Sequence, residues 1–134
     1  MKILPNKINK FFDSILSKLS VPKKDRNLLI KSLLDSSLRG VDSHGIRLFS
    51  HYVKCIENGR IKAKPKMKLI KKNRGVAVYD ADDGLGHVAA LKASAIVSSM
   101  AKKNGIASIG IINSSHYGAA GVYSMDIAQN DCVG

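Results

Sequence analysis

The sequence predicts an α/β fold in which an amino-terminal helical segment precedes a mixed α/β portion. Along residues 6–57, apolar side chains recur at the three-and-four spacing of amphipathic helices. After Gly59 the pattern changes to shorter, strand-like stretches, and residues 106–112 form a nearly unbroken apolar run, which is typical of a strand buried on both faces. We therefore divide the chain into a helical segment, residues 1–60, and an incomplete α/β domain, residues 61–134.

Three helices are predicted in the helical segment, over residues 6–19, 22–38 and 42–57. Pro22 suits the first position of the second helix, because that position needs no backbone N–H donor. Gly40 ends this helix, and Asn58-Gly59 ends the third. The third helix is expected to begin at Asp42 or Ser43, because either side chain can cap it.

The α/β domain is predicted to open with a hairpin around Asn73-Arg74-Gly75 and then to alternate helices and strands. Strands are expected over residues 67–71, 76–79 and 106–112, an acidic loop over residues 80–86, and helices over residues 87–103 and 119–129. The alternating lysines of residues 62–72 suit an edge strand with a solvated face, which resists mispairing. Residues 131–134 resemble the opening of another strand, so we expect the chain to stop within the fold.

The composition is that of a globular protein with its own core. The chain has 134 residues and is 45% hydrophobic. It holds no apolar run long enough to cross a bilayer, and its amino terminus lacks the apolar core of a secretory signal. The two cysteines, Cys55 and Cys132, have no metal-type spacing and are expected to be reduced thiols. We therefore expect a cytoplasmic protein and no contact with a membrane.

The formal net charge of +12 leaves a second class of function open, a basic nucleic-acid-binding module. The lysines are scattered along the chain, however, and the aromatic residues are only three Phe and four Tyr, with no Trp. Stacking platforms for single strands usually need more aromatic side chains. Solvated lysines are therefore the favoured interpretation, and nucleic acid is not an expected partner.

Two short segments combine a histidine with hydroxyl residues and a glycine, which is typical of sites that transfer protons. The first, Gly40–Gly45, contains Ser43 and His44. Imidazole titrates near neutral pH and can both donate and accept a proton. At the start of a helix, the helix dipole is expected to lower the pKa of His44, and Ser43 can relay its proton. An ordinary helix cap is the alternative interpretation of this segment.

Two further side chains of the expected third helix are candidates for substrate binding. Arg47 lies one turn beyond His44 and can hold a carboxylate with two parallel hydrogen bonds. Tyr52 lies two turns beyond His44 and can add a hydroxyl group to the same face. His51 has a different angular position on this helix, so we do not assign it to the site.

The second segment, Asn113–Gly118, follows the apolar strand and contains Ser115 and His116. The small residues from Gly118 to Gly121 come shortly after His116 and permit the close approach of a ligand. Strand ends and helix starts are common locations of binding sites in α/β proteins. A tight turn that uses Asn, Ser and Gly for backbone reasons is the alternative.

His87 is expected to have a capping or structural role, because it follows Gly84-Leu85-Gly86 at the start of a helix. No third glycine follows at the dinucleotide spacing, so the Rossmann fingerprint is absent. A metal site assembled from His44, His87 and His116 is conceivable, but no pair has zinc-type spacing and we expect no metal.

Three stretches give the sequence a resemblance to a known family. They are residues 39–48, residues 83–87 and residues 113–123. In their order and spacing they resemble the amino-terminal part of the malate/L-lactate dehydrogenase family. That family is distinct from the Rossmann-fold lactate and malate dehydrogenases and includes ureidoglycolate and sulfolactate dehydrogenases. The resemblance implies the family's non-Rossmann fold, truncated after about its first two-fifths.

The resemblance also implies an oxidoreductase that interconverts 2-hydroxy acids and 2-oxo acids with NAD or NADP. It implies a homodimer in the full-length form, with most cofactor contacts in segments beyond Gly134, so we expect the chain to be inactive alone. A gene relic without function remains an alternative. The assigned residues are His44, Ser43 and His116 for catalysis, Arg47, Tyr52 and Ser115 for the substrate, and Gly118, Ala119 and Ala120 for the cofactor.

Overall fold

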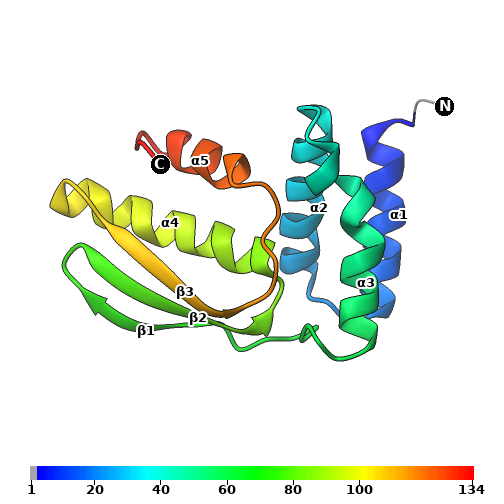
Figure 1. The fold of residues 1–134 in the computed structure, drawn as a ribbon, viewed down its shortest axis with the longest axis horizontal. Coiled ribbons are helices and arrows are strands. Elements are labelled where there is room, and N and C mark those ends of the chain that lie inside the picture. The colour runs from blue at the N-terminus through cyan, green and yellow to red at the C-terminus, as the bar shows by residue number, and fades with distance from the viewer. Residues whose placement is uncertain (1–2) are drawn as a thin grey trace.

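The computed structural model describes residues 3–134, which form a layer of three helices beside a small sheet covered by two further helices (Figure 1). The helical layer contains α1 (Pro5–Lys18), α2 (Lys23–Leu38) and α3 (Phe49–Glu57). The remainder contains β1 (Lys68–Asn73), β2 (Val76–Gly84), α4 (Gly86–Asn104), β3 (Ser108–Ser114) and α5 (Gly121–Ala128). The predicted α/β class, with its helical segment first, is therefore confirmed.

A single apolar cluster joins the two parts of the chain. Its fully buried members include Leu16 of α1, Leu33 of α2 and Tyr52 of α3, and it continues into Leu85 and Val88 at the start of α4. Burial of aliphatic and aromatic side chains on this scale is the main stabilising contribution to a domain of this size. The position of α4 relative to α3, and hence the geometry between them, is fixed by this shared core.

The third helix begins later than the sequence predicts. Instead of a helix from residue 42 or 43, two short 3₁₀ turns, η1 (Asp42–His44) and η2 (Ile46–Leu48), precede α3. Between them Gly45 is extended and packs so closely on Ser37 of α2 that a Cβ atom would overlap the Ser37 hydroxyl. The N–H of Ile46 donates to Ser37 Oγ at 2.9 Å. Because of this attachment to α2, the predicted third helix does not form from residue 42 or 43, and α3 begins only at Phe49.

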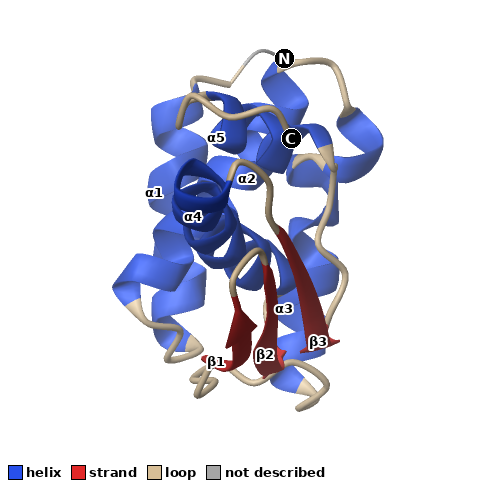
Figure 2. Cartoon of the chain, turned by 90° about the vertical axis from the view of Figure 1, so that its left-hand side faces the viewer, coloured by secondary structure: helices blue, strands red, loops and turns tan. Residues whose placement is uncertain are grey.

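The sheet has three strands in the order β1-β2-β3. The β1–β2 pair is an antiparallel hairpin, as predicted, and β3 runs parallel to β2, with α4 as the crossover (Figure 2). The acidic stretch predicted as a loop mostly continues β2, because the strand extends to Gly84 through an irregular segment. Asp82 and Asp83 have positive φ angles of 46° and 54° in this segment, which explains its loop-like composition.

The apolar strand was predicted to be buried on both faces, and this prediction is wrong. β3 is an edge strand, and no residue of β3 is fully buried. Ile109 and Ile111 are half-buried beneath α4 and α5, whereas Ile112 is exposed. Within residues 3–134, nothing covers its other face or pairs with its outer edge.

The chain after α5 also differs from the prediction. Residues 131–134 form no strand, because they have no strand neighbour among the described residues, and Val133 is fully exposed.

The lysine-rich β1 lies at the edge of the sheet opposite to β3 with all its residues exposed, as expected of a solvated edge. In residues 3–134, each helix is either too short or too polar to pass through a bilayer.

Candidate active site

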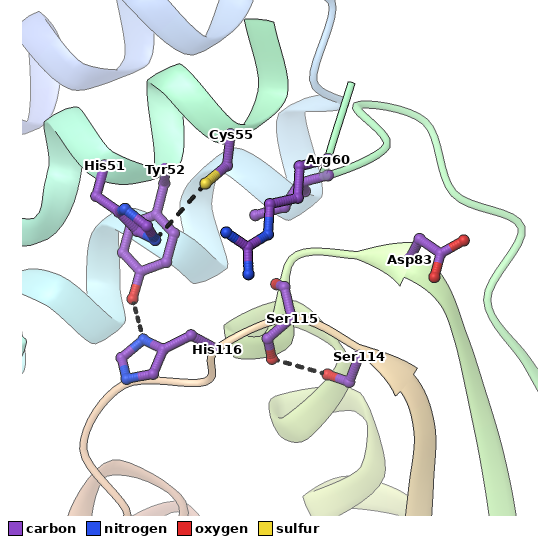
Figure 3. Close-up of a pocket in the computed structure, with 9 residues that line it drawn as sticks. His51, Tyr52, Cys55, Arg60, Asp83, Ser114, Ser115 and His116 are labelled. Carbon is purple, nitrogen blue, oxygen red and sulfur yellow. Dashed lines mark hydrogen bonds between the residues drawn. The ribbon is translucent and has the colours of Figure 1, made fainter. Parts of the chain in front are cut away.

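A pocket of about 210 Å³ lies where the carboxyl ends of β2 and β3 meet α3 (Figure 3). It is lined by His51, Tyr52, Cys55, Arg60, Ile61, Asp83, Ser114, Ser115 and His116. The carboxyl ends of parallel strands are the usual location of ligand sites in α/β folds. The shared core between α3 and α4 brings the helical layer to this edge, so the pocket is built from both parts of the chain.

The imidazoles of His44 and His116 lie together beside this pocket. Their ring centroids are 5.6 Å apart with an interplanar angle of 28°. His44 belongs to η1 and His116 to the loop after β3, so two distant segments of the chain converge here. Ser43 Oγ lies 2.9 Å from His44 Nδ1. No helix begins at His44, however, because α3 starts only at Phe49, so the helix dipole predicted to act on His44 is not placed to do so.

Tyr52 fixes the ring of His116. Its side chain is completely buried, and its hydroxyl lies 2.7 Å from His116 Nδ1 (Figure 3). Burial, with a smaller contribution from Cys55, raises the pKa of Tyr52 to about 12, so the hydroxyl keeps its proton at neutral pH. A hydroxyl can both donate and accept, so it can stay bonded to Nδ1 whether His116 is neutral or charged. The buried position of Tyr52 makes it a partner of His116 rather than an open substrate contact.

The neutral form of His116 is favoured by its surroundings. Burial, followed by the neighbouring His44 and His51, lowers the pKa of His116 below its usual value. Among the described residues, Nε2 of His116 has no hydrogen-bond partner, and the residue as a whole is exposed. His116 therefore has one nitrogen held by Tyr52 and the other free to exchange a proton with a bound molecule.

Beneath this pair, His87 is a buried ring at the start of α4. It is 1% exposed, and neither ring nitrogen has a hydrogen-bond partner within residues 3–134. Its ring meets Tyr52 edge-on, with centroids 4.9 Å apart, and the backbone of Gly118 closes over its Nε2. Burial, with smaller effects of His116 and His44, lowers the pKa of His87 to about 3. His87 is thus a neutral support for Tyr52 and for the loop that carries His116.

This buried ring predicts a pH-dependent stability. The unfolded chain protonates His87 near pH 6.5, whereas the folded chain does so only near pH 3, so the free energy of unfolding should fall as pH drops through this window. The loss from His87 should be roughly 1.4 kcal/mol for each pH unit. Urea denaturation at several pH values measures it. The variant His87→Leu removes the titrating group, and an equally steep acid loss in that variant would contradict the prediction.

Ser115 anchors the His116 loop to the start of α4. Its hydroxyl donates to the Gly84 carbonyl at 3.0 Å and accepts from the Gly86 N–H at 2.9 Å. Gly86 is packed so tightly that a Cβ atom would lie 2.6 Å from the His116 carbonyl oxygen. Ser115, predicted to bind substrate, lines the pocket while its hydroxyl is engaged by these backbone groups.

The residues assigned to the cofactor lie in the segment between β3 and α5. Gly118 is buried with a φ of 78°, Ala119 is half-buried, and Ala120 is exposed immediately before α5. An apolar groove of about 410 Å³ runs beside this segment. It is lined by small and aliphatic side chains of α4, β3 and α5, including Ala90, Ala93, Ile109 and Ile127.

The structure separates Arg47 from the pocket and adds residues that sequence reasoning missed. Arg47 is exposed and does not line the pocket, whereas His51, Cys55 and Arg60 do. We excluded His51 by assuming one helix from residue 42, and the break at Gly45 removes that assumption. The spacing of His51 and Cys55, one turn apart on α3 with Nε2 and Sγ 3.6 Å apart, was the available signal. Residues 3–134 contain no group of three or more side chains arranged to hold a metal ion.

Solved structures with the same fold include dehydrogenases. Malate dehydrogenase from Pyrococcus horikoshii OT3 matches with a TM-score of 0.92 at 32% identity, over 96% of this chain and 37% of that one. Sulfolactate dehydrogenase from Methanocaldococcus jannaschii matches with a TM-score of 0.90 at 34% identity, over 93% of this chain and 36% of that one. The fold is therefore the α/β fold of this class of dehydrogenases.

The chain belongs to the malate/L-lactate dehydrogenase family, whose model matches residues 3–134. The resemblance recognised in the sequence is thereby confirmed. Among curated relatives, malate dehydrogenase from Pyrococcus abyssi is 33% identical over all 134 residues, which cover 37% of its length. The L-sulfolactate dehydrogenase of Methanocaldococcus jannaschii is 34% identical, and the chain covers 39% of it. The chain thus spans about two-fifths of the length of such relatives.

Proposed function

We propose that this chain provides the proton-transfer site of an oxidoreductase that interconverts 2-hydroxy acids and 2-oxo acids. The observation that carries the proposal is the pairing of His44 and His116 at 5.6 Å, with Nδ1 of His116 held by Tyr52. The names of the relatives, which include malate, sulfolactate and hydroxycarboxylate dehydrogenases, support the substrate class. The family assignment gives no support to a nucleic-acid-binding module.

In this proposal His116 handles the proton of the reacting oxygen. When a 2-oxo acid is reduced, the imidazolium form of His116 gives its Nε2 proton to the carbonyl oxygen, which becomes a hydroxyl, and the ring is left neutral. In the reverse direction Nε2 of the neutral ring accepts that proton. The hydroxyl of Tyr52 stays on Nδ1 and keeps the ring oriented in both directions. The lowered pKa of His116 favours its return to the neutral form after the proton has left. His44, whose ring centroid lies 5.6 Å from that of His116, and Ser43 beside it offer a second route for the proton.

The cofactor expected from the family is NAD or NADP, which supplies or accepts the hydride when bound. The small residues Gly118, Ala119 and Ala120 fit this expectation, because they lie just beyond Tyr117 in the same loop as His116 and have little or no side chain to block a flat ring. The groove next to them is mostly apolar, and its lining has no cationic side chain to pair with a phosphate. We therefore assign only the nicotinamide side of the cofactor to this chain. For the complete enzyme we also propose a homodimer in the cytoplasm.

An assay of hydride transfer tests the proposed function. The 134-residue chain and the longest polypeptide that its gene encodes are each mixed with NADH or NADPH and a panel of 2-oxo acids, and nucleotide oxidation is followed. We expect oxidation with the longer polypeptide and none with the chain alone, because most cofactor contacts are expected elsewhere. A folded longer polypeptide that oxidises neither nucleotide with any acid of the panel would refute the proposal.

A further inference from the structure

Arg60 brings a positive charge into the pocket. It lies three residues beyond α3, and its backbone N–H donates to Asn58 Oδ1 at 3.2 Å, which fixes the turn that carries it. Its guanidinium extends into the space between Cys55 and Ser115, on the side of the pocket where His116 lies (Figure 3). A guanidinium is charged at every physiological pH, so this charge is permanent.

No carboxylate of the described residues neutralises this guanidinium. Within residues 3–134, none lies within the 4.0 Å that defines an ion pair. Asp83 also lines the pocket, but its Oδ2 pairs with Lys62 Nζ at 3.4 Å, and that lysine also binds Asp82 at 2.6 Å. In Figure 3 the Asp83 carboxylate lies well to the side of the guanidinium. The other titratable side chains of the lining, His51, Tyr52, Cys55 and His116, include no carboxylate.

The guanidinium N–H donors of Arg60 are thus available to a ligand. A guanidinium presents parallel N–H donors that match a carboxylate or a sulfonate, and such charge-assisted pairs are among the stronger hydrogen-bonded contacts. A small pocket with an unpaired guanidinium on one side and a proton-exchanging imidazole on another suits a small anion whose reacting oxygen faces His116. Arg47, which the sequence predicted for this role, does not line the pocket, whereas Arg60, which is exposed like Arg47, does.

We propose that Arg60 binds an anionic group, carboxylate or sulfonate, of the substrate and positions it against His116. The identity of the ligand as a 2-hydroxy or 2-oxo acid rests on the proposed function, whereas anion binding by Arg60 does not. A binding experiment therefore separates the two: it requires no hydride transfer, and a failed activity assay leaves its outcome intact.

The experiment titrates the 134-residue chain with oxamate, a monoanion shaped like a 2-oxo acid, and with L-malate, a dianion. Binding is followed by the C2-proton NMR signals of the chain's four histidines, of which His51 and His116 line the pocket. We expect shifts of these two signals, and a loss of affinity of roughly 10-fold or more in Arg60→Gln. Arg60→Lys should retain part of the affinity, because lysine keeps the positive charge but lacks the parallel N–H donors of the guanidinium. Arg74→Gln, in the distant β1–β2 turn, is the matched control.

The two probes locate the group that Arg60 binds. If Arg60→Gln weakens both, Arg60 holds the carboxylate next to the reacting carbon; if it weakens only L-malate, Arg60 holds the second anionic group. Either result supports the proposal. Unchanged affinity in Arg60→Gln for both probes, a loss confined to Arg47→Gln, or no binding by the unmodified chain would overturn it.

Discussion

Replacing His116 with glutamine is expected to lower the rate of 2-oxo acid reduction by roughly 100- to 10,000-fold, the usual contribution of a general acid or base. Glutamine retains polar atoms near the position of the ring but cannot release a proton at neutral pH. The measurement is kcat/KM for NADH oxidation in the longest polypeptide that contains the chain. The effect should fall mainly on kcat, because the proton moves only in the chemical step.

A graded control distinguishes proton transfer from general disruption of the site. Tyr52→Phe keeps the aromatic ring, and hence its contact with His87, but removes the hydroxyl that lies 2.7 Å from His116 Nδ1. It should reduce the rate much less than His116→Gln, and it should alter the pH dependence of kcat, because the surroundings of Nδ1 change. A His116→Gln enzyme with the unmodified rate and pH profile would remove His116 from the mechanism.

The substitution Gly86→Ala is expected to damage both stability and activity. The new Cβ would overlap the Ser115 carbonyl oxygen and lie 2.6 Å from that of His116, and both are backbone atoms that cannot rotate away. The loop that carries His116 must therefore move. We expect the free energy of unfolding to fall by about 1–3 kcal/mol and kcat/KM to fall by at least roughly 10-fold. Urea denaturation and the NADH assay measure the two effects.

Gly121→Ala provides the matched control. Gly121 is the first residue of α5, as Gly86 is of α4, but a Cβ there has no atom within 4 Å. Alanine favours helix over glycine by up to about 1 kcal/mol, so this variant should be as stable as the unmodified chain or slightly more so. Equal behaviour of the two variants would show that close packing at Gly86 does not hold the His116 loop.

Patterns confined to one element predicted the fold well. Three-and-four spacing gives α1 and α2 within a residue or two, and the glycines at 40, 59 and 105 mark helix ends with positive φ angles. The apolar run of β3 identified a strand but not its surroundings, because burial depends on what packs against both faces. Local composition likewise predicted a loop at the irregular end of β2. Asp82 and Asp83 have turn-like backbone angles there, although they lie within a strand.

Only those residues of the candidate site that belong to short sequence motifs could be predicted. His44 and His116 stand out because each combines an imidazole with neighbouring hydroxyl groups and a glycine, and the structure brings their rings together. The position of His51 follows from the late start of α3 after the break at Gly45, where the chain contacts Ser37 of α2, and that of Arg60 from the turn at Asn58. His87 could not be assigned as a buried neutral support, because its burial depends on Tyr52 and Gly118, which come from other segments.

The outer edge of β3 has a consequence for experiments on assembly. In a parallel strand, alternate residues direct their amide protons to opposite sides, and one side of β3 already faces β2. The other amide protons meet solvent in residues 3–134 and should exchange with deuterium quickly. Any polypeptide that extends the sheet at this edge would slow exchange at alternate positions from Ser108 to Ser114, and this two-residue periodicity would report its docking without a covalently attached probe.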